Sequence, residues 1–513
     1  MAAPTFTEIE RKYDAADDLP LPDLVGLPGV SATAEPVAQR LVAVYHDTAD
    51  LALARASITL RRRTGGDDAG WHLKLPVSGD RREEVRLPLT DESEEVPAAL
   101  LERVLVHVRD RPVVAVVRLE NERLVHRLLD AAGAVVAEVC DDHVVASRLL
   151  EDGTPQSWRE WEVELVGGSG DLLEETGQRL LDAGAVPAAG PSKLARALGL
   201  QAPGRPADDD EGPPSPEGPA SRLLLAYLGQ QAHQLVRMDP LVRVDAPDAV
   251  HKMRVAARRA RSALATYEPL LAEGAGAWLR GELRWLGSEL GAARDTEVIR
   301  GRIERLLEEQ PDDAVRAAAA AQVETTMDAR HELAAITARA ELSGPRYFRL
   351  LDALEEFLAA PPLTDRGERR ARDEAVRLLR RDWKRLRRRT KVAAGAGRQE
   401  RAAALHDVRK AAKRLRYAAE SAVPVLGGPA EELVRACTEL QDLLGEHQDA
   451  IVTADTLQDL RRAALRGTGT RGLFKRLRRQ EHQYAEELAP GYQDVLDALP
   501  AGHRGRWLRG GKD

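Results

Sequence analysis

The chain has 513 residues, of which 43% are hydrophobic, 31% charged and 4% aromatic, and its formal net charge at pH 7 is −8. This length exceeds one ordinary core, so two or three domains are expected. Two distant cysteines, Cys140 and Cys437, exclude a disulfide scaffold, and the sequence shows neither an apolar run of about 18 residues nor a signal-peptide pattern. We therefore expect a cytoplasmic protein without a membrane partner.

Residues 1–200 are predicted to be mainly β-strands. Short runs rich in β-branched residues are separated by turn signals such as GGDDAG, VSGD and EDGTP. The expected strands include RLVAVYHDT, ITLRRR, GWHLKLP, EEVRLPL, VVAVVRLENERLVHRLL, VVAEVCDDHVVA and EWEVELV. Helices are expected near residues 97–108 and 172–183, so this part of the chain should be a sheet with flanking helices.

Charged residues stand at alternate positions in several of these runs. Glu8, Glu10 and Lys12 would share one face of a strand, because strand side chains alternate between faces. One such run by itself would more simply be a solvated face. The pattern recurs in four further pairs: Arg61 and Arg63, His72 and Lys74, Glu84 and Arg86, and Glu162 and Glu164. Repetition with both signs of charge favours a barrel with a polar interior.

The rest of the chain is predicted to be a linker followed by helices. Residues 201–219 (QAPGRPADDDEGPPSPEGP) are rich in Pro, Gly and acids and read as an extended linker. From residue 220 to about 505, apolar residues recur every three or four positions, which indicates an all-α domain. Two motifs recur at offsets of 155 and 154, so we expect a duplication with repeats at about 220–340 and 370–505.

Each repeat carries a basic helical face. At about 100° per residue, one histidine and three cations fall within an arc of about 80° in both copies, and the two sets are His251, Arg254, Arg258, Arg261 and His406, Arg409, Lys413, Arg416. Residues 366–416 add to this charge, with 20 Lys or Arg against 6 Asp or Glu. Such a surface favours a polyanion. Few aromatics interleave with the cations, so a phosphate polymer is favoured and nucleic acid is not.

The doubled pattern H-x-x-R-x-x-x-[RK]-R-x-R, followed by L-G-x-x-x-D, resembles the CHAD domain. The resemblance covers residues of about 220–505. It implies an α-helical domain that binds inorganic polyphosphate, with the eight residues of the two basic faces as its contacts.

The run Glu8-x-Glu10-x-Lys12 resembles the signature of the CYTH family, the triphosphate tunnel metalloenzymes. Further elements follow in the order of that family: Tyr45-His-Asp-Thr48, Leu60-Arg-Arg-Arg63, Leu73-Lys74, Glu84-Val-Arg86, Glu138-Val-Cys-Asp141, Glu162-Val-Glu164 and Ser192-Lys193. The resemblance implies an eight-stranded antiparallel tunnel barrel over residues 1–200. The whole chain thus resembles the bacterial CYTH–CHAD inorganic triphosphatases, a multidomain α+β architecture.

The chemistry of a triphosphate assigns roles to these charges. Mg²⁺ or Mn²⁺ prefers oxygen ligands, and the expected ligands are Glu8, Glu10, Asp141, Glu162 and Glu164. Cations would hold the phosphates, namely Lys12, Arg61, Arg63, Lys74, Arg86, Arg123 and Lys193, with Arg118 competing with Arg123. Glu84 is expected to orient the attacking water, in preference to Glu83, and acts with Lys12 and Lys74 as the catalytic set.

We therefore expect metal-dependent hydrolysis of inorganic triphosphate, with the ends of polyphosphate as a further substrate, next to a domain that concentrates phosphate chains by tethering. No protein partner is implied. Three alternatives stay open: an adenylyl cyclase, a thiamine triphosphatase, and a non-catalytic protein that localises to polyphosphate granules. The carboxylates argue against the last, because they would weaken simple anion binding.

Overall fold

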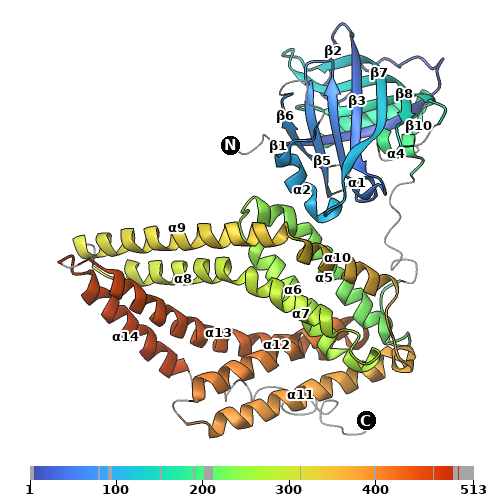
Figure 1. Ribbon diagram of the computed structural model, residues 1–513. Helices are drawn as coiled ribbons and strands as arrows, with labels where there is room; N and C mark the ends of the chain where they lie inside the picture. The colour runs from blue at the N-terminus through green and yellow to red at the C-terminus, as the bar shows by residue number, and fades with distance from the viewer. Residues whose placement is uncertain are drawn as a thin grey trace. The chain divides into compact units, whose positions relative to one another are not determined.

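A computed structural model describes residues 5–78, 81–89, 95–150, 153–188, 190, 192–200, 212–311, 313–397, 400–465, 467–488, 491 and 495, without the side chains of 5–8, 77, 78 and 81. The chain divides into two compact units, Met1–Asp210 and Glu211–Asp513, which we describe separately (Figure 1).

The first unit is built on an antiparallel sheet. Within the described residues it has ten strands: β1 (Thr5–Ala15), β2 (Ala32–Thr33), β3 (Val37–Thr48), β4 (Thr59–Thr64), β5 (Gly70–Ser78), β6 (Arg81–Leu87), β7 (Val113–Leu129), β8 (Val135–Arg148), β9 (Gln156–Leu165) and β10 (Val186–Pro187). The predicted antiparallel sheet is confirmed, with two short strands, β2 and β10, in addition to the eight long ones.

Strand β1 has two partners besides β10. Its first half pairs with β6, where Glu8 lies opposite Arg82, and its second half pairs with β9, where Lys12 lies opposite Glu162. The strand order β1-β6-β5-β4-β3-β7-β8-β9 therefore leads back to β1. Because side chains alternate along each strand, every long strand presents one of its two faces to the same inner side.

Four helices belong to this unit: α1 (Ala52–Arg55), α2 (Ala98–Val108), α3 (Gly170–Asp182) and α4 (Lys193–Leu198). Helix α2 packs on β4, β5 and β6 in one apolar cluster, and α3 packs on β1, β8 and β9 in another. Helix α4 packs against the inward side chains of β3, β7, β8 and β9, where Leu194 and Ala197 contact Val117, Val144 and Trp158. It therefore covers one end of the inner side.

The second unit is helical, as predicted. Its α-helices are α5 (Ser221–Arg243), α6 (Ala249–Thr266), α7 (Ala277–Glu289), α8 (Gly291–Glu308), α9 (Ala314–Leu342), α10 (Pro345–Ala359), α11 (Ala371–Gly395), α12 (Arg401–Leu426), α13 (Gly428–Ala463) and α14 (Thr470–Leu488), with short 3₁₀ turns at Glu268–Leu270 and Asp365–Glu368. Helices α8, α9, α13 and α14 share one apolar cluster, and α5 and α6 neighbour each other, as do α11 and α12 (Figure 1).

The two repeated motifs lie on equivalent elements. The basic motifs occupy α6 and α12, which meet through Tyr267 and Ser421, whose hydroxyls are 2.9 Å apart. The second motif begins α8 at Gly291 and lies inside α13 at Gly445. One continuous helix, α13, therefore corresponds to the pair α7 and α8, which are separated at Leu290.

The predicted linker is described only from residue 212. Residues 201–211 lie outside the described residues, whereas Pro216 and Gly218 accept backbone hydrogen bonds from Arg372 and Ala371. The C-terminal part of the predicted linker is therefore fixed to the start of α11. In the described part of the chain, no helix combines the length and hydropathy needed to cross a membrane.

Candidate functional site

The inner side of the sheet encloses a cavity of about 280 Å³. Side chains from all eight long strands and from the start of α4 line it, and most of them are polar. Ten of the residues predicted for the triphosphate site are among them: Glu10, Lys12, Arg61, Arg63, Lys74, Arg86, Arg123, Glu162, Glu164 and Lys193. The alternation of charge along the strands therefore brings these residues to one cavity.

Cations crowd the part of the cavity formed by β4, β5 and β6. We call this set the cation wall: Arg61, Arg63, Lys74, Arg82 and Arg86. The strand register brings them together, since Thr59 is opposite Lys74 and Arg61 is opposite His72, which in turn faces Arg86. Burial and the charges of Arg61 and Arg123 lower the pKa of Arg63 to about 9. An anion in the cavity would relieve this repulsion.

Glu84 lies beneath the cation wall and does not line the cavity. Its carboxylate is fully buried, is ion-paired with Arg86 and lies 2.9 Å from Nδ1 of His72. One of its oxygens is 4.0 Å from Nζ of Lys74. Glu84 therefore holds two cations of the wall in place, which differs from the predicted role of orienting a water molecule.

Carboxylates also line the cavity, on β1, β9 and β8, and Glu10 lies 4.0 Å from Arg82 of the cation wall. Glu10 is opposite Glu164 in the β1–β9 pairing, and Glu164 is opposite Glu138 in the β8–β9 pairing. These three residues, the carboxylate row, all line the cavity. Burial would raise the pKa of Glu10, but the charges of Lys12 and Lys74 lower it to about 2. Glu10 is therefore ionised at neutral pH.

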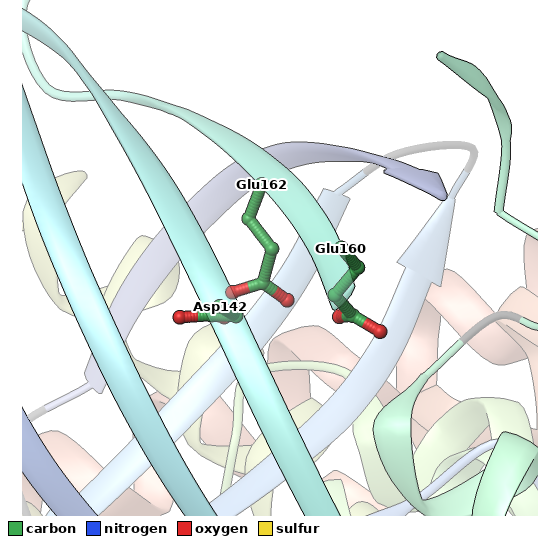
Figure 2. A group of neighbouring side chains, drawn as sticks. All are labelled: Asp142, Glu160 and Glu162. Atoms are coloured by element: carbon green, nitrogen blue, oxygen red, sulfur yellow. The ribbon is translucent and has the colours of Figure 1, made fainter. Parts of the chain in front are cut away.

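A second set of carboxylates surrounds the ammonium group of Lys193. Asp142 on β8 and Glu160 and Glu162 on β9 bring carboxylate oxygens within 4.8 Å of one another (Figure 2). Nζ of Lys193 lies 2.8 Å from Asp142, 2.8 Å from Glu160 and 2.7 Å from Glu162. This spacing could hold a metal ion, but Lys193 already supplies the cation.

Two further cations complete this network. Arg123 forms two hydrogen bonds of 2.7 Å with Asp142 and one of 2.6 Å with Glu162. Lys12 pairs with Glu162 and, at 3.0 Å, with Glu10. Burial opposes the charge of Lys12, but Glu10 and Glu162 raise its pKa above the ordinary value. The network therefore consists of ionised groups, each with an opposite charge in contact.

Besides Glu84, two predicted residues of the described chain, Arg118 and Asp141, do not line the cavity. The Arg118 side chain is 47% exposed and pairs with Glu120 on the outer face of β7, so Arg123 is the cavity cation of that strand. Asp141 accepts hydrogen bonds of 2.8 and 2.7 Å from Arg159, which also donates to the carbonyl groups of Ala16, Asp17 and Leu19. Asp141 therefore fixes the segment after β1. The side chain of Glu8 is outside the described residues.

The sequence interpretation passed over Asp142, Glu160 and Glu138. Alternation could have found them. Asp142 lies four positions after Glu138 and so shares its face of β8, whereas Asp141 lies two positions after the core residue Val139 and shares the other face. Glu160 lies two positions before Glu162 and shares its face of β9.

The carboxylate row offers oxygen ligands for a divalent cation, although in the described part of the chain the three acids whose oxygens lie within 4.8 Å of one another are Asp142, Glu160 and Glu162. Glu10 and Glu138 of the row also pair with Lys12 at 3.0 Å and Arg127 at 2.8 Å. The carboxylates of the row lie side by side on three neighbouring strands, line the cavity and supply the oxygen ligands that Mg²⁺ and Mn²⁺ prefer. Glu162 lies two positions before Glu164 on β9 and lines the same cavity. The ion would then share the cavity with the cation wall.

The helical unit has a groove of about 500 Å³ between α6, α7, α11 and α12. Nine cations line it: Arg258, Arg261, Arg280, Arg284, Arg385, Arg389, Lys410, Lys413 and Arg414. Among its described lining residues, Asp407 is the only carboxylate. Burial and the charges of Arg409 and Arg258 lower the pKa of Lys413 to about 7. Glu268 and Asp382, which are not among the lining residues, pair with Arg280 at 3.1 Å and Arg414 at 2.9 Å.

Three of the eight residues predicted for the basic faces line this groove: Arg258, Arg261 and Lys413. Arg254 instead bonds to Asp295 at 2.9 Å and to the carbonyl oxygen of Gly291 at 3.1 Å. A side chain at Gly445 would come within 3.1 Å of Arg409. The L-G-x-x-x-D motifs thus receive the first arginine of each basic motif.

The other three predicted residues also lie outside the groove. Arg416 pairs with Glu420 at 3.2 Å. His251 and His406 are half-buried, and burial together with neighbouring cations lowers the pKa of each. Both imidazoles are therefore neutral at pH 7.

Comparison with known proteins places these features in a family. The chain is 40% identical over 467 residues to the uncharacterized protein MT2285 of Mycobacterium tuberculosis (strain CDC 1551 / Oshkosh), covering 88% of each chain. Among solved structures, PptA from Streptomyces chartreusis is 22% identical with a TM-score of 0.46, covering 54% of this chain and 99% of PptA. The CHAD domain from the plant Ricinus communis is 26% identical with a TM-score of 0.40, covering 58% of this chain and 94% of that domain.

The family models match the two units in turn. Residues 7–197 match the CYTH domain, and residues 226–458 match the CHAD domain. Together with the full-length relative, these matches show that the chain belongs to the family in which a CYTH domain, of the triphosphate tunnel metalloenzyme type, is followed by a CHAD domain.

Proposed function

We propose that the CYTH domain hydrolyses inorganic triphosphate to diphosphate and phosphate with a divalent cation, and that the CHAD domain binds inorganic polyphosphate. The observation that carries the first part is the presence of both sets in one cavity. The cation wall and the carboxylate row line the same space and adjoin at Arg82 and Glu10, so a phosphate chain and a metal ion can be bound at the same time.

The cation wall binds the phosphates in this proposal. Arg61, Arg63 and Arg86 present planar donor groups that suit bidentate contacts to phosphate oxygens, and Lys74 adds a point charge. Glu84 positions Arg86 and lies beside Lys74. These cations stabilise the charge that spreads over the equatorial oxygens of the transferred phosphoryl group.

Glu10 and Glu164 of the carboxylate row would hold Mg²⁺ or Mn²⁺, with Glu138 and Glu162 beside them. The ion would supply charge that offsets the phosphates and makes the attack of water easier. Water attacks the terminal phosphorus, the bond to the bridging oxygen breaks, and diphosphate leaves. Lys12 and Lys193 keep Glu162 ionised and fixed. We infer that the inner side of the sheet is a barrel-like tunnel, since β1 pairs with both β6 and β9.

Substrate competition tests the catalytic proposal. We expect the full chain to release phosphate from inorganic triphosphate with Mg²⁺ or Mn²⁺, and ATP or thiamine triphosphate in equal amount to slow it only weakly. Faster turnover of thiamine triphosphate, or formation of cyclic AMP from ATP, would replace inorganic triphosphate as the substrate. No turnover of any of the three would leave phosphate binding as the only role of the CYTH domain.

The CHAD groove carries the second part of the proposal. Within the described ranges, Arg258, Arg261 and Arg284 have no carboxylate within 4.0 Å, and the same holds for Arg385 and Lys413. A phosphate polymer would neutralise them without stacking surfaces. Binding of long-chain polyphosphate to the full chain, measured in a chelator so that hydrolysis cannot occur, checks this part.

A further inference from the structure

Because of the duplication, the CHAD domain has two faces formed by corresponding helices of the two repeats. Around the contact of α6 with α12, one face lies between α6, α7, α11 and α12 and contains the groove. The face that corresponds to it through the duplication is formed by α12, α13, α5 and α6. We call these the groove face and the counterpart face.

Buried residues fix which positions correspond. In α7 and α13, Leu279, Leu283, Leu286 and Leu290 match Leu433, Cys437, Leu440 and Leu444 at an offset of 154, and all are buried. In α5 and α11, Leu224, Tyr227, Leu228, Gln231 and Leu235 match Ala375, Leu378, Leu379, Asp382 and Leu386 at an offset of 151, and all are buried. In α6 and α12 the basic motifs correspond at an offset of 155.

Five cations of the groove face have uncharged counterparts. The pairs are Arg280 with Val434, Arg284 with Thr438, Arg385 with Gln234, Arg389 with Met238, and Lys410 with Val255. These five come from three different helices. The loss of charge therefore extends around the periphery of the counterpart face.

Three of the six cations at the counterpart positions pair with a carboxylate of the protein. Arg259 and Arg416, which correspond to Arg414 and Arg261, lie 3.1 and 3.2 Å from Glu420. The counterpart face has two cations of its own, Lys252 and Arg435, at the positions of Asp407 and Gly281. Lys252 lies 3.7 Å from Asp248. Of the nine groove cations, Arg280, Arg389, Lys410 and Arg414 lie within 4.0 Å of a carboxylate. The counterpart positions hold six cations, and two of them, Arg258 and Lys413, are the ones that also line the groove.

We propose that the CHAD domain binds polyphosphate on the groove face alone, along α7, α6, α12 and α11, and that the counterpart face has lost this capacity. This rests on the proposed polyphosphate binding and names the surface that performs it. The polyanion follows the net positive charge, because each neutralised phosphate releases a counterion. A symmetric domain would bind along both faces.

Paired charge removals in the full chain test the inference. Arg284→Thr/Arg385→Gln gives the groove face the residues of its counterpart, and the matched control Lys252→Gln/Arg435→Gln removes two exposed cations from the counterpart face. The probe is long-chain inorganic polyphosphate in a chelator, with Kd measured over a range of salt concentrations. All four positions are at the surface, and circular dichroism of each variant checks the fold.

We expect the groove variant to bind at least about tenfold more weakly, with the slope of log K against log salt reduced by about 1.4 to 1.8, at roughly 0.7–0.9 per charge. The control should change Kd less than about twofold. Equal losses in the two variants would overturn the asymmetry and leave polyphosphate binding intact. Absence of binding by the wild type would overturn the proposed function of the CHAD domain as well.

Discussion

The CYTH cavity and the CHAD groove are both rich in cations, but they differ in how many carboxylates lie among these cations. Glu10 and Glu162 in the cavity, and the fully buried Asp142 beside Glu162, lie among cations that lower the pKa of each carboxyl and keep it ionised. In the groove, Asp407 is the only carboxylate among the described lining residues. The buried carboxylates of the CYTH domain are balanced by Lys12, Arg123 and Lys193, whereas five groove cations have no carboxylate within 4.0 Å in the described ranges. Under the proposed function, this difference separates the site of phosphate cleavage from the site of phosphate capture.

Removal of the metal should have the largest effect, because it should abolish triphosphate hydrolysis and leave polyphosphate binding unchanged. A chelator is expected to abolish phosphate release from triphosphate by the full chain, because the carboxylate row then faces the anion without its metal. Polyphosphate binding in the same solution should persist. Loss of both on chelation would show that the CHAD groove also depends on a metal and would contradict this separation of cleavage from capture.

Removal of one cation from the wall should lower the rate strongly. Arg61→Gln is expected to reduce kcat/KM for triphosphate on the order of 10²-fold, as for loss of one preorganised donor. The matched control is Arg118→Gln, which removes an arginine from the outer face of β7 and should change kcat/KM less than about twofold. Equal losses would mean that net charge matters and the wall does not.

Adjacent aspartates on β8 sharpen the distinction between cavity and scaffold. Asp142→Asn removes one of three contacts of Lys193 and should impair triphosphate turnover. Asp141→Asn breaks the buried pair with Arg159 and should lower the free energy of unfolding by about 3–5 kcal/mol, with KM for triphosphate unchanged. Thermal unfolding and initial rates on both variants check this, and a changed KM in Asp141→Asn would contradict it.

These two residues also show how far the sequence could go. Alternation along strands predicted which charges share a face, and ten predicted residues line the cavity. Alternation alone does not say which of the two faces of a strand is the inner one. For β8 this left open whether Asp141 or Asp142 faces inward, and for β7 whether Arg118 or Arg123 does. The contacts of Lys193 depend on where α4 packs, which a single sequence does not encode locally.

The helical domain shows the same limit. Helical periodicity placed the basic faces on α6 and α12, yet Arg254 turns to Gly291 and Asp295 through tertiary packing. The groove instead draws Arg280, Arg284 and Arg385 from neighbouring helices. Local periodicity predicted the charge of the surface, whereas helix packing decides which charges meet.

The smallest expected effect is a pH dependence of polyphosphate binding. The pKa of Lys413 is lowered to about 7, and a bound polyanion raises it again, so binding takes up a proton between the two values. Affinity should be constant below pH 7 and fall severalfold as the pH rises through about 7. Lys413→Arg keeps its charge and should flatten the profile. His251 and His406 also face these cations, and an unchanged slope in Lys413→Arg would assign the effect to them.

The most direct test of the central claim is the rate of phosphate release from inorganic triphosphate with Mg²⁺ or Mn²⁺ by the wild type and by Glu10→Gln. This change keeps the size of the side chain and removes one charge from the carboxylate row. We predict turnover by the wild type and a loss on the order of 10²-fold or more in the variant, with polyphosphate binding retained. Equal rates in the two proteins would contradict a metal-dependent reaction in the CYTH cavity.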